Sequence, residues 1–173
     1  MAQTLYKLIK DSNKDAQIEV LSPNWSMPIL ERMEEVSRSI TSPFNHGELK
    51  IKDRFDIGKQ LREECYQRAI VMTNSLKSSL IPFFAKIPIR TGWLGEMRFG
   101  LINDIRSKEK SKYPLMIEQF AKLSINPIED LNKQLPYPSL RIDSCNLKEL
   151  FINLEIDSEK PSIAICPGAE FGP

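Results

Sequence analysis

A strand–helix–strand pattern between residues 69 and 93 constrains the fold of this chain most strongly. Residues 69–72 form a short apolar run that ends in a polar turn, as a buried strand of a parallel sheet does. Residues 76–85 then place leucine and phenylalanine on one helical face, and residues 88–93 fit a second short strand. Because parallel strands need such a crossover helix, this unit predicts an α/β fold.

Shorter patterns on both sides continue the alternation. Helices are predicted at residues 1–11, 25–33, 49–63, 113–123 and 146–154, and further strands at 16–21, 36–40 and 162–166. Residues 124–141 contain three prolines and are predicted to be a connector. Gly58 weakens its helix by roughly 1 kcal/mol relative to alanine. Together the elements predict a mostly parallel, Rossmann-like sheet with helices on both faces.

Composition argues against several classes of function. The 173 residues carry a net charge of +1, and a pI of about 7.7 does not suit a nucleic-acid binder. Three cysteines without a CxxC motif indicate reduced thiols and a cytoplasmic protein. A single histidine, His46, argues against a histidine-based zinc site. No run of 18 apolar residues occurs, so that any contact with a membrane is expected to be peripheral.

Seven polar or aromatic residues are expected near the carboxyl ends of the two central strands: Asn74, Ser75, Lys77, Arg90, Trp93, Glu96 and Arg98. In open parallel α/β sheets, ligands bind outside these strand ends. Helix N-termini there offer free N–H groups, while arginine and lysine add positive charge. The set therefore predicts an anionic or polyhydroxylated ligand.

Each of these residues also has a structural interpretation. Thr73, Asn74 or Ser75 can cap the following helix, and Arg90 and Arg98 can pair with Glu96 or Asp104. Trp93 is either a sugar-stacking platform or a core aromatic, and Glu96 or His46 could act as a general base or only order its loop. No GxGxxG or GxxxxGK[ST] motif occurs, which argues against a general nucleotide-binding Rossmann domain.

Four stretches resemble the N-terminal domain of the heptosyltransferases of glycosyltransferase family 9. They are MAQTLYKLIK (1–10), LSPNWSMPILERMEEV (21–36), TNSLKSSLIPFFAKIPIRTGWLGEMRFGLINDIR (73–106) and CPGAEFGP (166–173). The resemblance implies a GT-B enzyme, in which two Rossmann-like domains face a cleft. Residues 1–160 would be the acceptor-binding domain, and residues 161–173 the start of the donor-binding domain, with Gly168, Glu170 and Gly172 as donor-side candidates.

The reaction implied by the resemblance is transfer of heptose from ADP-heptose to the lipopolysaccharide inner-core acceptor heptosyl-Kdo2-lipid A, with inversion. It implies no metal and no cofactor besides the donor substrate. It also implies a monomer in the cytoplasm of a Gram-negative bacterium, in peripheral contact with the inner membrane.

The family also places a strand and a GPSWVGD-like loop, which holds the catalytic Asp, before the first helix. The helix at residues 1–11 has no capping sequence before it. The expectation is therefore a fragment without its first strand, catalytic base and donor domain, and inactive by itself. The alternative is a non-catalytic truncated gene product or an acceptor-binding remnant.

Overall fold

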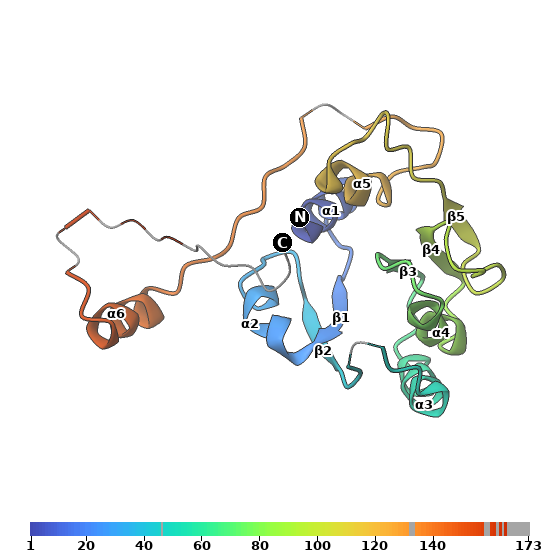
Figure 1. Cartoon of the computed structure of the whole chain (residues 1–173), viewed down its shortest axis with the longest axis horizontal. Helices are drawn as coiled ribbons and strands as arrows, with labels where there is room; N and C mark the ends of the chain where they lie inside the picture. Colours follow the sequence, from blue (N-terminus) through green and yellow to red (C-terminus); the bar gives the residue numbers. More distant parts are fainter. Residues whose placement is uncertain (46, 132–133, 158–159, 162, 164, 166–173) are drawn as a thin grey trace. The chain divides into compact units, whose positions relative to one another are not determined.

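The structure, a computed structural model, describes residues 1–45, 47–131, 134–157, 160–161, 163 and 165, and the chain divides into two units, Met1–Leu140 and Arg141–Pro173. The elements of the first unit, in chain order, are α1 (Ala2–Ser12), β1 (Glu19–Pro23), η1 (Asn24–Ser26), α2 (Met27–Leu30), β2 (Arg38–Ser42), α3 (Ile51–Leu61), β3 (Arg68–Val71), α4 (Leu76–Phe84), β4 (Ile89–Trp93), β5 (Asp104–Arg106) and α5 (Met116–Lys122) (Figure 1).

The strands of this unit form two parallel sheets. In the first, β1 pairs with β2, and Leu21 lies opposite Ile40. In the second, β3, β4 and β5 are neighbours in that order, and Thr91 of β4 pairs with Ile70 on one side and Asp104 on the other. The predicted α/β class and parallel pairing are confirmed. Among the described strands the parallel pairing is in two parts, because β1 and β3 are not hydrogen-bonded to each other.

One hydrophobic core joins the two sheets through α1. Leu5 and Tyr6 of α1 are buried with Val20 of β1, Trp93 of β4 and Leu123 just after α5. The helix also packs directly against α5. Burial of such apolar side chains, at about 25 cal/mol per Å², is the main stabilising contribution available to this unit.

Helices α3 and α4 make a second close contact, centred on Gly58. The side chains of Phe55 and Phe84 meet edge to face, with ring centroids 5.3 Å apart. A Cβ atom added at Gly58 would lie 2.6 Å from the Cβ of Phe84 and 3.0 Å from the carbonyl oxygen of Ile81. Glycine is therefore the residue that lets these two helices approach.

Several predicted boundaries shift. The strands expected at residues 16–21 and 36–40 lie two or three residues later, because polar residues such as Ser22 and Thr41 fit a short, half-exposed parallel pair. The helix expected at 25–33 is only a 3-10 turn and a single helical turn, and Trp25, at 79% exposed, contributes little burial that would favour a longer helix. The short strand β5 was not predicted, because two of its three residues are charged.

The helix expected at residues 113–123 is the shorter α5, whose start is fixed by Glu118, which accepts the backbone N–H of Leu115 at 2.9 Å. In the second unit, α6 (Ser144–Asn153) begins at Asp143, whose side chain accepts the backbone N–H groups of Cys145 and Asn146. The described part of residues 124–141 has no helix or strand, as predicted for a connector. The strand predicted at residues 162–166 lies largely outside the described residues.

No helix in the described part of the chain is long and apolar enough to cross a membrane.

Candidate functional site

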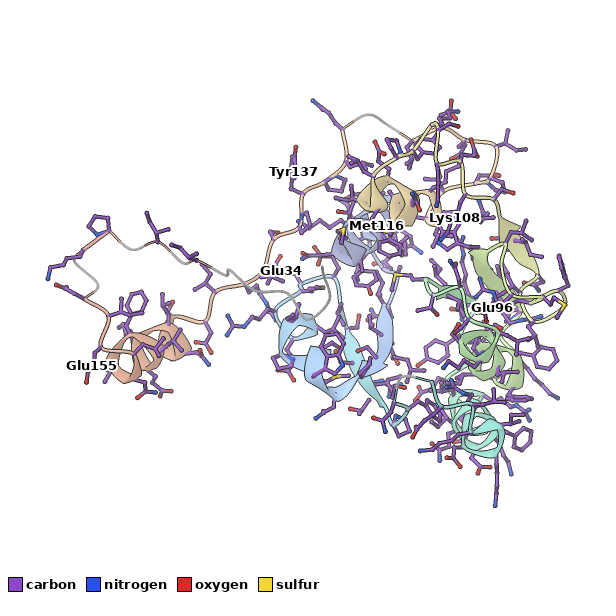
Figure 2. The ribbon with its side chains drawn as sticks, in the orientation of Figure 1. Glu34, Glu96, Lys108, Met116, Tyr137 and Glu155 are labelled. Carbon is purple, nitrogen blue, oxygen red and sulfur yellow. The ribbon has the colours of Figure 1, made fainter. Side chains whose placement is uncertain are left out.

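The loops after β3 and β4 meet at the start of α4. Glu96, on the loop after β4, accepts the backbone N–H of Leu76 at 2.8 Å, so this carboxylate caps α4 (Figure 2). Ser75 stands at the N-cap position, but its side chain makes no capping hydrogen bond and instead contacts the hydroxyl of Ser78. The sequence predicted a cap from residues 73–75, whereas the structure uses an acid 20 residues further along the chain.

Arg98 joins the carboxyl ends of the two strands. Its guanidinium donates to the carbonyl oxygen of Thr73 at 2.7 Å and to that of Trp93 at 2.5 Å, and the residue is only 2% exposed. Burial lowers the pKa of Arg98, and the nearby charge of Glu96 opposes this shift. Arg98 therefore links the ends of β3 and β4 from inside the protein, and its charged group is not on the surface.

Trp93 and Arg90 also contact the protein itself. Trp93 is 3% exposed and belongs to the core, although the Nζ of Lys108 lies 5.7 Å from its ring centroid. Arg90 lies near the amino end of β4 and not with the others. Its guanidinium faces the ring of Phe83 and donates to three backbone carbonyl oxygens, at 2.6, 3.2 and 2.6 Å (Ile87, Gly100 and Leu101).

Asn74, Lys77 and Glu96, together with the half-buried Ser75, are the predicted site residues that solvent reaches at this edge. Asn74 and Glu96 are exposed, and Lys77 is half-buried with no hydrogen-bond or ion-pair partner among the residues that the structure describes. They surround the N-terminus of α4, where the helix dipole favours a negative charge and Glu96 already accepts the N–H of Leu76. Such an arrangement can bind a carboxylate or a phosphate. His46, Gly168, Glu170 and Gly172 lie outside the described residues.

A second polar cluster, which the sequence did not predict, lies on one face of the same sheet and extends from the first residue of β3 to the last residue of β5. Asp104 accepts two hydrogen bonds from Arg106, both at 2.8 Å, and one from the hydroxyl of Thr91 at 2.7 Å, while Arg68 lies 3.6 Å away. Burial by itself would raise the pKa of Asp104, but these hydrogen bonds and the charges of both arginines outweigh it and hold the pKa below its usual 3.8. The signal in the sequence that could have revealed this cluster is the presence of charged residues at the ends of short strands.

We expect Asp104→Asn to destabilise the protein by about 2 kcal/mol near neutral pH, because it leaves two close guanidiniums without their shared carboxylate. Since the pKa of Asp104 is lowered on folding, its contribution is complete above pH 3.8 and is lost as the pH falls through its lower folded value. Urea unfolding from pH 7 down to pH 3 should therefore show the two proteins converging in acid. A difference that does not change over this range would contradict the role of the carboxylate charge.

Comparison with known proteins decides the family. The model of glycosyltransferase family 9 (heptosyltransferase) matches residues 54–173, which is more than half of the chain. The chain belongs to glycosyltransferase family 9. Residues 73–106, which resemble this family in sequence, contain the loops after β3 and β4 that form the candidate site.

The family 9 relatives match this chain from end to end. Lipopolysaccharide heptosyltransferase 2 of Salmonella typhimurium is 44% identical over 178 residues, and that of Escherichia coli K12 is 43% identical over 178 residues. Lipooligosaccharide heptosyltransferase 2 of Haemophilus ducreyi is 41% identical over 180 residues. Each alignment includes 100% of this chain and 51% of the relative, so the chain spans about half the length of the curated relatives it matches.

The fold of a solved family member agrees. The structure of E. coli ADP-heptose LPS heptosyltransferase II superposes with a TM-score of 0.88 at 40% sequence identity, covering 99% of this chain and 51% of that one. The arrangement of helices and strands around the candidate site is therefore that of an experimentally observed family 9 protein.

Proposed function

We propose that this chain is the acceptor-binding half of a GT-B enzyme that transfers heptose from ADP-heptose to the lipopolysaccharide inner core. The observation that carries the proposal is the 44% identity to a lipopolysaccharide heptosyltransferase 2 along the whole chain. The agreement in fold with E. coli heptosyltransferase II supports it. The acceptor would be heptosyl-Kdo2-lipid A, and the transfer would invert the anomeric centre without a metal.

The exposed groups at the start of α4 suit this acceptor. An inner-core saccharide carries carboxylates and phosphates, and the helix N-terminus together with Lys77 favours such anions. Because Glu96 already accepts the N–H of Leu76, a carboxylate of the acceptor would have to replace Glu96 there or bind beside it, next to Lys77. In this proposal Asn74 and Lys77 bind the acceptor, while Arg98 and Trp93 hold the loops that present them.

The proposed acceptor also suggests where the protein works. Its lipid A portion lies in a membrane, so we infer that the protein acts at the cytoplasmic face of the inner membrane as a peripheral monomer. The exposed apolar side chains of Leu94, Met97 and Phe99 lie on the same loop as Glu96 and are available for such contact.

A chimera tests the proposal. Residues 1–173 would replace the matching half of the S. typhimurium enzyme, and heptose transfer from ADP-heptose to heptosyl-Kdo2-lipid A would be measured. We expect transfer, with kcat/KM lowered about tenfold by Lys77→Gln, because one charge-assisted contact to the acceptor is lost.

Lys59→Gln, which removes an exposed lysine on α3, is the matched control and should leave kcat/KM unchanged. A chimera that is folded by circular dichroism but transfers no heptose would contradict the proposal. Equal losses in the two lysine variants would contradict the assignment of Lys77.

A further inference from the structure

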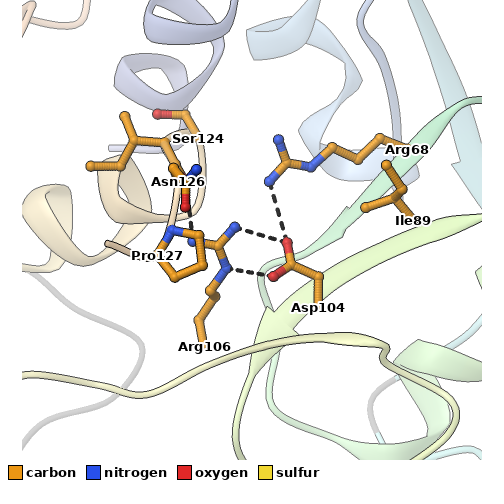
Figure 3. A pocket seen from close by; sticks show the side chains of 8 residues that line it. Arg68, Ile89, Asp104, Arg106, Ser124, Asn126 and Pro127 are labelled. Atoms are coloured by element: carbon orange, nitrogen blue, oxygen red, sulfur yellow. Dashed lines mark hydrogen bonds and ion pairs between the residues drawn. The ribbon is translucent and has the colours of Figure 1, made fainter. Parts of the chain in front are cut away.

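One face of the β3–β4–β5 sheet carries an open cavity of about 410 Å³ (Figure 3). It is lined by the first residue of each strand (Arg68, Ile89 and Asp104), by Arg106, and by residues 124–127 after α5. A volume near the low end of small-molecule sites, about 300–1,000 Å³, can hold a small oxyanion with a short organic group attached.

The lining of this cavity carries more positive than negative charge. Two guanidiniums share a single carboxylate, and none of the other lining residues is acidic. Arg106 is 6% exposed and uses its remaining N–H group on the carbonyl oxygen of Ile125 at 2.9 Å, so Asp104 and Arg106 form a complete pair. The charge of Arg68 is left in excess.

Two donors in the lining have no partner. Arg68 donates from Nε to the hydroxyl of Thr91 at 2.9 Å and from one terminal nitrogen to the carbonyl oxygen of Leu123 at 3.0 Å. Within the described residues, its other terminal nitrogen, Nη1, makes no hydrogen bond. The same holds for the amide nitrogen of Asn126, whose oxygen accepts the N–H of Ile128.

We propose that this cavity binds phosphate or a small phosphate monoester, held by Arg68 and Asn126. A tetrahedral oxyanion presents oxygens to a donor from the sheet and a donor from the loop at once. Nη1 of Arg68 would donate to one phosphate oxygen and the amide of Asn126 to another, and the excess charge in the lining is neutralised. Burial lowers the pKa of Arg68, the charge of Asp104 opposes this shift and that of Arg106 adds to it, so a bound anion would further stabilise the charged guanidinium.

This site is distinct from the candidate acceptor site. Arg68 begins β3, whereas Asn74 and Lys77 follow its carboxyl end. The four residues of β3, at about 3.3 Å per residue, place Arg68 roughly 10–13 Å from the carboxyl end of this strand. The inference therefore does not depend on the proposed heptosyl transfer, and an anion bound here would stabilise the sheet without competing with an acceptor.

A titration of the full chain at constant ionic strength tests the proposal. Inorganic phosphate, glycerol 3-phosphate and glycerol would be added separately while backbone amide resonances are recorded. We expect saturable shifts around residues 68, 104–106 and 124–127, with a dissociation constant on the order of 1 mM or below for both phosphates, and no response to glycerol. Tighter binding of glycerol 3-phosphate would identify a monoester as the preferred ligand, and equal binding would identify free phosphate.

Variants complete the test. Arg68→Gln should weaken binding about tenfold, and Asn126→Ala, at an exposed position, about threefold. Arg32→Gln removes a guanidinium outside the cavity and should leave the affinity unchanged. Absence of saturation at about 20 mM phosphate, or equal weakening in Arg32→Gln, would overturn the proposal. If Arg68→Gln does not fold, unchanged affinity in Asn126→Ala would overturn it.

Discussion

Replacing Gly58 by valine is expected to destabilise the protein by about 4 kcal/mol, which is a large part of the total stability of a domain of this size. The first side-chain carbon would lie 2.6 Å from the Cβ of Phe84 and 3.0 Å from the carbonyl oxygen of Ile81. Neither neighbour is the end of a flexible chain, so α3 and α4 must move apart. Helix propensity by itself predicts that alanine would stabilise this position by about 1 kcal/mol, and the contact reverses that sign.

Urea unfolding followed by circular dichroism measures this effect. Lys59→Val is the matched control, because it introduces the same side chain one position later on the exposed face of α3. It should cost about 0.5 kcal/mol, from helix propensity alone. A Gly58→Ala variant that is more stable than the parent protein would show that the contact between α3 and α4 is looser than described.

Replacing Arg98 by methionine is expected to cost about 3 kcal/mol. Methionine has a similar length but no donors, so the carbonyl oxygens of Thr73 and Trp93 lose their partner inside the protein. Removing a buried guanidinium offsets part of this loss, because the charge no longer has to be desolvated. Arg98→Lys should also destabilise, since one ammonium group cannot reproduce the two-pronged arrangement of the guanidinium.

The same unfolding measurement checks this prediction. Arg32→Met is the control, and it should change the free energy of unfolding by less than about 0.5 kcal/mol. If Arg98→Met were equally harmless, Arg98 would not hold the strand ends together, and the interpretation of its guanidinium as a ligand-binding group would regain support.

The central β3–α4–β4 unit could be predicted from sequence to within one residue at most boundaries, because its apolar runs end at polar turns. β5 could not, because Asp104 and Arg106 satisfy each other and Arg68 in the folded chain, and a charged strand has no apolar pattern to reveal it. The division of the strands into two sheets depends on pairing between distant segments, which local pattern does not specify.

The position of the candidate site could be predicted from the sequence, but the role of each of its residues could not. Its position after β3 and β4 followed from the rule for parallel sheets. The sequence could not distinguish an exposed arginine from the buried Arg98, since burial depends on which backbone carbonyls come close after folding. The cap that Glu96 gives to α4 likewise joins residues 20 positions apart.

The most direct test of the central claim, that the loops after β3 and β4 form an acceptor site, is a titration of the isotope-labelled chain with the heptosyl-Kdo2 saccharide. We predict saturable shifts of the backbone amides at residues 74–77 and 94–98, and loss of these shifts in Lys77→Gln. Saturable binding that shifts only amides elsewhere, or no binding by a folded chain, would contradict it.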